Sequence, residues 1–108
     1  MKGPQKQKNK HSERSPEQKR LLALIRGKFQ DVKSLQSMRK HLNGKMKETE
    51  DDKMQMYLII AQNSLAESQS LLGSKGVAEA QKRFELAMNE LRFASEIIEH
   101  YRQEAERT

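Results

Sequence analysis

The feature that most constrains the fold is a regular apolar pattern in the last third of the chain. Small and apolar residues recur there in alternating steps of three and four, the spacing of a helix with one buried face. These residues are Val77, Ala80, Phe84, Ala87, Leu91, Ala94, Ile98 and Tyr101. A heptad pattern sustained over more than three repeats is typical of coiled-coil-like packing, so we expect a helix over about 76–106.

A helix is also predicted over about 16–42, and its start is the clearest local signal in the sequence. Ser15 can cap this helix, Pro16 suits the first helical position, and Gln18 completes a capping box. The apolar positions that follow are Leu21, Leu22, Ile25, Phe29, Val32, Leu35, Met38 and Leu42. Gly27 interrupts this pattern, at a cost of about 1 kcal/mol relative to alanine. We expect the helix to end at Asn43–Gly44, because both residues tolerate the left-handed conformation of a C-terminal cap.

A third helix is predicted between these two, over about 50–72. We expect it to begin at Thr49, with Asp51 and Asp52 in the first turn, where the helix dipole favours acidic side chains. Its buried face should carry Met54, Leu58, Ala61, Leu65, Ser68 and Leu72. The segment Gly73–Gly76 predicts a short loop, and short loops make consecutive helices antiparallel neighbours.

Together these patterns predict an all-α fold, an antiparallel three-helix bundle with coiled-coil-like packing over residues 16–107. No segment shows the alternation of a strand. The alternative architecture is a helical hairpin that dimerises into four or six helices, and the closed bundle is the simpler of the two. Residues 1–15 contain no Leu, Ile, Val or Phe and are rich in Lys, Gln and Ser, which predicts a disordered basic arm.

Several function classes lack the residues that they need. The chain has no cysteine, which excludes disulfides and thiolate metal sites and agrees with a cytoplasmic or other reducing compartment. The apolar run Met56–Ala61 is far too short to span a membrane. Without a phosphate-binding loop or a Ser–His–acid arrangement, we expect no enzyme, no cofactor and no small-molecule substrate. Glu96, His100 and Glu104 fall four residues apart, but a metal site needs a further ligand, so we expect none.

Charge is distributed unevenly along the chain, whose net charge is +6. Residues 1–50 contain 14 Lys and Arg against 5 Asp and Glu, a balance of +9. Residues 51–108 contain 7 against 10, a balance of −3. Such polarity suits a protein whose first half approaches an anionic partner.

Four basic residues of the first predicted helix recur every seven positions and should lie along one edge: Lys19, Arg26, Lys33 and Lys40, here called the basic stripe. We predict that this stripe and Lys6, Lys8 and Lys10 of the arm contact the phosphate backbone of RNA or DNA. The competing interpretation is that acidic residues of a neighbouring helix neutralise the stripe, for which Glu79, Glu90 and Glu104 are available.

The last helix carries a second row of apolar residues, Leu86, Phe93 and Ile97, here called the apolar stripe. It widens the apolar arc of that helix to roughly 200°, more than two neighbours need. The simpler interpretation is that this helix is central and that the Met56–Ala61 run lies in the thickest part of the core. The alternative is an adaptor or small regulator, able to form a homodimer, that binds a protein partner through the apolar stripe, with Met54 and Met56 as adaptable contacts.

Overall fold

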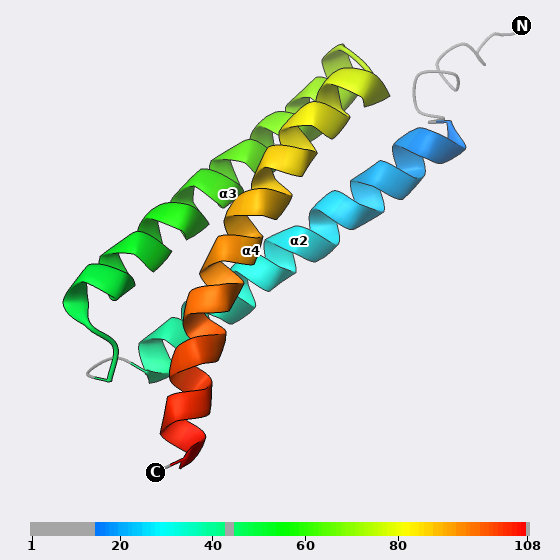
Figure 1. Ribbon diagram of the computed structural model, residues 1–108. Coiled ribbons are helices and arrows are strands. Elements are labelled where there is room, and N and C mark those ends of the chain that lie inside the picture. The colour runs from blue at the N-terminus through cyan, green and yellow to red at the C-terminus, as the bar shows by residue number, and fades with distance from the viewer. Residues whose placement is uncertain (1–14, 43–44, 108) are drawn as a thin grey trace, which may run out of the picture.

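The structure, a computed structural model, describes residues 15–42 and 45–107, which form three α helices and no strand (Figure 1). The helices are α2 (Pro16–His41), α3 (Glu48–Ser74) and α4 (Val77–Arg107). Consecutive helices run antiparallel, so α2 and α4 point in the same direction. The predicted all-α three-helix fold is therefore confirmed. The arm and the Asn43–Gly44 helix end lie outside the described residues.

The start of α2 follows the predicted capping box. The Ser15 hydroxyl accepts a hydrogen bond from the Gln18 backbone N–H at 3.1 Å, and the Gln18 side-chain oxygen accepts one from the Ser15 N–H at 2.9 Å. Pro16 occupies the first helical position, where its missing N–H leaves no bond unmade. These few residues fix where the chain enters the bundle.

The ends of α3 differ from the predicted ones by one or two residues. The helix begins at Glu48, one residue before Thr49, and its first turn contains three acidic side chains that the dipole stabilises. It continues through Gly73 and Ser74, whereas we expected these residues in the loop. The turn forms at Gly76, whose φ is +104°, and the Leu71 carbonyl accepts the Gly76 N–H at 2.9 Å. The second glycine of the predicted loop therefore makes the turn, and the first does not.

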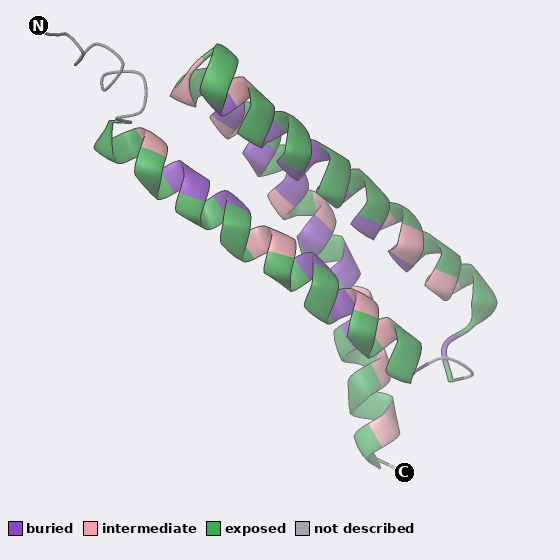
Figure 2. Ribbon diagram, turned by 180° about the vertical axis from the view of Figure 1, so that it is seen from behind, coloured by how far each residue is buried: buried purple, intermediate pink, exposed green. Residues whose placement is uncertain are grey.

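The core confirms the seam predicted for α4 residue by residue. Its six middle residues are buried, and Val77 and Tyr101 at its two ends are half-buried. The six residues predicted for α3 are all buried too, and the Ser68 hydroxyl donates to the Ala80 carbonyl at 2.7 Å. Figure 2 shows these buried residues along the inner sides of the helices.

Two apolar predictions are wrong. Met38 of α2 was placed on the buried face but is 37% exposed, because it lies at the border of an open groove between α2 and α4. The Met56–Ala61 run does not lie in the thickest part of the core: Met56, Ile59 and Ile60 are 50%, 55% and 39% exposed. Only Leu58 and Ala61 of this run are buried, because α3 has neighbours on one side only.

The helix α2 covers one side of the α3–α4 hairpin, and an ion pair holds its C-terminal end there. The Arg39 guanidinium donates to both carboxylate oxygens of Asp51 at 2.9 and 3.1 Å. Gln55 donates to the same carboxylate at 3.2 Å. The Arg39 and Asp51 side chains are only 17% and 22% exposed, so this pair links the end of α2 to the start of α3 in a partly desolvated setting.

Candidate nucleic-acid interface

All four residues of the basic stripe are exposed on α2. Their spacing of seven residues places neighbouring side chains about 10.5 Å apart along the helix. Lys33 and Lys40 line a groove together with Gln62 of α3, so this half of the stripe lies on the edge of α2 that faces α3. The structure therefore presents the four cations as one exposed row along α2.

The acidic residues considered as neutralising partners are not paired with the stripe. Glu79 forms an ion pair with Lys82 at 3.6 Å, and Glu104 forms one with Arg107 at 3.4 Å, both within α4. Within the described part of the chain, no carboxylate forms an ion pair with any of the four stripe residues. Their charges are thus available to an external anion.

Two other basic residues of α2 are engaged inside the protein. Lys28 pairs with Asp31 at 3.1 Å on the side of α2 that faces α4. Arg39 is held by Asp51, as described above. Arg20 lines a groove with Val77 and Gln81 of α4. The other Lys and Arg residues of α2 that form no ion pair within the described residues are the four of the basic stripe.

The groove next to the stripe is lined by no acidic residue that the structure describes. The groove between α2 and α3 has a volume of about 270 Å³ and is lined by Phe29, Val32, Lys33, Gln36, Ser37, Lys40 and Gln62. From Met54 to Ala66, α3 has no charged residue at all. Amide and hydroxyl groups such as these commonly donate to phosphate and sugar oxygens. Sequence reasoning missed Gln36 and Ser37, although their positions three and four residues after Lys33 place them on the same side of the helix.

The three arm residues predicted to contact phosphate, Lys6, Lys8 and Lys10, lie outside the described residues. The arm joins the bundle at Ser15, four residues before Lys19, the first residue of the stripe.

The apolar stripe lies on the side of the α3–α4 hairpin that α2 does not cover. Leu86 and Phe93 are 46% and 39% exposed, and Ile97 is half-buried. The centroid of the Phe93 ring lies 5.4 Å from that of the Tyr57 ring on α3. The Arg92 guanidinium lies 5.6 Å from the centroid of the Phe93 ring. Met54, predicted as an adaptable contact, is fully buried, whereas Met56 is half exposed. The interpretation that the apolar stripe belongs to the core is thus wrong for Leu86 and Phe93.

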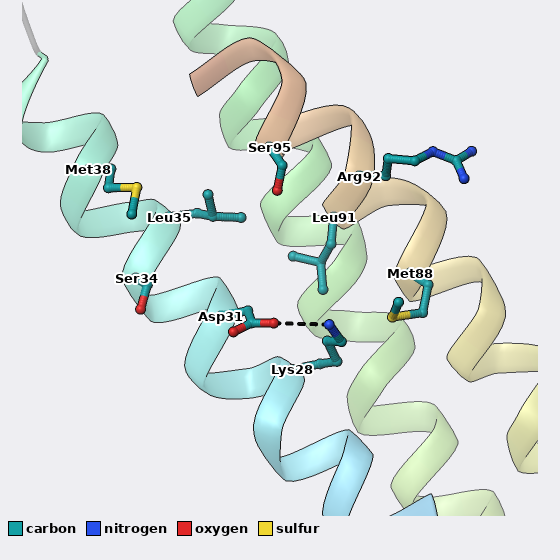
Figure 3. Close-up of a pocket in the computed structure, with 9 residues that line it drawn as sticks. All are labelled: Lys28, Asp31, Ser34, Leu35, Met38, Met88, Leu91, Arg92 and Ser95. Atoms are coloured by element: carbon teal, nitrogen blue, oxygen red, sulfur yellow. Dashed lines mark hydrogen bonds and ion pairs between the residues drawn. The ribbon is translucent and has the colours of Figure 1, made fainter. Parts of the chain in front are cut away.

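A further groove lies between α2 and α4, with a volume of about 430 Å³. Figure 3 shows Leu35 and Met38 of α2 and Leu91 and Met88 of α4 lining it from both sides, with the Lys28–Asp31 ion pair between the helices. Ser34 and Ser95 also line this groove, but its lining contains no histidine that could act as their base. Its lining combines apolar side chains with the Lys28–Asp31 ion pair.

The described residues include no cluster of three or more His, Asp or Glu side chains arranged to hold a metal ion. Nor does any helix among them have the length and apolarity to cross a membrane. The chain matches no protein-family model, no curated protein and no solved structure.

Proposed function

We propose that this protein is a non-enzymatic binding protein that contacts the phosphate backbone of nucleic acid through the basic stripe and the arm. The observation that supports this proposal is the exposed row of four cations with no acidic partner in the described part of the chain. The groove beside the row supplies hydrogen-bond donors, and among the described residues no carboxylate that would repel phosphate lines it. The acidic second half keeps the remaining surface away from the ligand.

Binding of this kind has a predictable dependence on salt. Each phosphate contact with double-stranded DNA adds about −0.9 to the slope of the logarithm of the binding constant against the logarithm of salt concentration. Four stripe residues and three arm lysines would give a slope of about −6. Because the contacts are to the backbone, affinity should not depend on base sequence.

Fluorescence anisotropy of a labelled mixed-sequence oligonucleotide at several salt concentrations tests the proposal. Relative to 1 M salt, each phosphate contact strengthens binding about eightfold at 0.1 M salt. The double variant Arg26→Glu with Lys33→Glu loses two contacts and should therefore bind at least about 60-fold more weakly at 0.1 M salt. The control is Lys53→Glu with Lys82→Glu, which changes the net charge equally but on other surfaces. If both double variants weaken binding equally, overall charge and not the stripe determines affinity, and the proposed interface is wrong.

Protein–protein interaction is the second candidate function, and the exposure of Leu86 and Phe93 favours it. Two large apolar side chains lie seven residues apart on α4, and Tyr57 extends the same surface onto α3. The partner that needs no further component is a second copy of this chain, which would place two hairpins face to face. Sedimentation equilibrium at micromolar concentrations tests this candidate, since a strictly monomeric protein would exclude the homodimer.

Both candidate functions are compatible with a cytoplasmic protein. Neither requires a disulfide or a bound cofactor, and the chain has no cysteine that a reducing compartment would affect.

A further inference from the structure

We infer that the ligand of the basic stripe is double-stranded nucleic acid, which the protein distinguishes from single strands. This inference rests on the proposed function and narrows it to one class of ligand. Three features of the structure carry it: the single helix that holds the row, the position of α3 beside it, and the position of the aromatic side chains.

The basic stripe lies on one rigid element. From Lys19 to Lys40 it extends over 21 residue steps of one continuous helix, about 31 Å at 1.5 Å per residue. A duplex of about nine base pairs has the same length, at 3.4 Å per base pair. Double-stranded nucleic acid is stiff over far greater distances, so a row of charges on one continuous helix meets a ligand of matching rigidity.

The cations at the C-terminal end of the stripe lie next to the face of α2 that packs on the hairpin, where Leu21, Ile25 and Val32 are buried. Gln62 of α3 lines the groove beside Lys33 and Lys40, so α3 keeps this edge of α2 from entering a groove of the duplex alone. The contacts should therefore run along the phosphates, without reading the sequence.

Of the five Phe and Tyr side chains, only Phe29 lies beside the stripe. Tyr57 and Phe93 contact each other on the far side of the hairpin, and Phe84 is buried. Phe29 borders the groove beside the stripe, but it packs against the hydrophobic core. Proteins that bind single strands without sequence preference stack bases on exposed rings, and each stacked base strengthens binding about 5- to 150-fold.

Without stacking, counterion release favours the duplex. Each phosphate contact adds about 0.9 to the salt slope on a duplex and about 0.7 on a single strand. We take the binding constants for duplex and single strand as equal at 1 M salt. For four stripe contacts, the difference in slope then makes duplex binding about tenfold tighter at about 50 mM salt. One stacked base would offset that preference, which makes the comparison a sensitive test.

The experiment compares anisotropy titrations of the full chain with DNA and RNA duplexes about 20 base pairs long and with their separated strands, chosen not to self-pair, at about 50 mM salt. We expect at least one duplex to bind about tenfold more tightly than its strands, and Phe29→Leu to leave this ratio unchanged. Single strands that bind as tightly as the duplexes would overturn the inference while leaving backbone binding intact. A loss of single-strand affinity in Phe29→Leu would overturn it too, because it would reveal base stacking. Absence of binding to every probe would instead reject the proposed function itself.

Discussion

Replacing Gly27 with alanine should stabilise the protein. Gly27 lies in the middle of α2, is exposed, and an added Cβ atom would meet no other atom within 4 Å. The substitution therefore costs no steric strain, while it removes the conformational freedom that glycine gives the unfolded chain. Helix propensities put the gain at about 1 kcal/mol in the free energy of unfolding.

Thermal and urea unfolding followed by circular dichroism would measure this gain. For a domain of about 60–100 residues, 1 kcal/mol corresponds to an increase in Tm of about 4–8 °C. The urea midpoint should rise while the slope of the transition stays constant, because the surface exposed on unfolding does not change. Gly27 follows Arg26 of the basic stripe, yet the substitution alters no charge, so affinity for nucleic acid should be unchanged.

Gly76→Ala is the matched control, with the opposite sign. The space around Gly76 is equally open, but its φ of +104° is strained for any residue with a Cβ atom. We expect a loss of about 1–2 kcal/mol, the cost of a left-handed conformation in an L-residue. If Gly27→Ala destabilises the protein, or if both substitutions shift the midpoint in the same direction, the backbone conformations assigned to these two glycines are wrong.

Two further substitutions test other contacts. Asp51→Ala should cost about 1.5–3 kcal/mol in urea unfolding, because it leaves the Arg39 guanidinium, only 17% exposed, without its carboxylate. Adding Arg39→Met should restore part of that loss, since a partly buried ion pair is often replaceable by apolar side chains. Phe93→Asp should keep the fold, although loss of the contact with Tyr57 should lower the free energy of unfolding by about 0.5–1.5 kcal/mol. The same substitution should convert any homodimer seen by sedimentation to monomer. It should leave the affinity for nucleic acid unchanged. A dimer that survives Phe93→Asp would place its interface elsewhere.

Local patterns predicted the helices well because each depends on residues close in sequence. The seam of α4 was correct throughout, since a helix that must bury one face can do so only at steps of three and four. The capping box at Ser15 was equally predictable, because its two hydrogen bonds join residues three apart. The position of the turn after α3 was harder to predict, since both Gly73 and Gly76 can end a helix and only backbone geometry distinguishes them.

Contacts between helices could not be predicted in the same way. The pairing of Arg39 with Asp51 joins side chains twelve residues apart on different helices, and many other acidic residues were available to Arg39. Met38 satisfied the apolar spacing of α2 but lies at the border of a groove, because α2 and α4 are separated there. Exposure of this kind depends on how closely two helices approach, and the pattern of one helix contains no information on that distance.

One choice that the sequence leaves open determines both candidate surfaces: the side of the α3–α4 hairpin on which α2 packs. The heptad patterns of the helices are the same for either arrangement. In the structure α2 covers the side that carries Met88 and Leu91, which leaves Leu86 and Phe93 exposed on the other. The basic stripe then lies beside the uncharged middle of α3, near Gln62.

In the opposite arrangement α2 would cover Leu86 and Phe93, and the interpretation of the apolar stripe as core would have been correct. The edge of α2 that carries Lys33 and Lys40 would then face α4, whose acidic residues include Glu79, Glu90 and Glu104. The stripe would lie within reach of carboxylates, as the competing interpretation required. The exposed apolar stripe and the unpaired basic stripe are thus two consequences of the side of the hairpin on which α2 packs. Reasoning helix by helix could therefore name the residues of both surfaces, but it could not decide whether either surface is accessible.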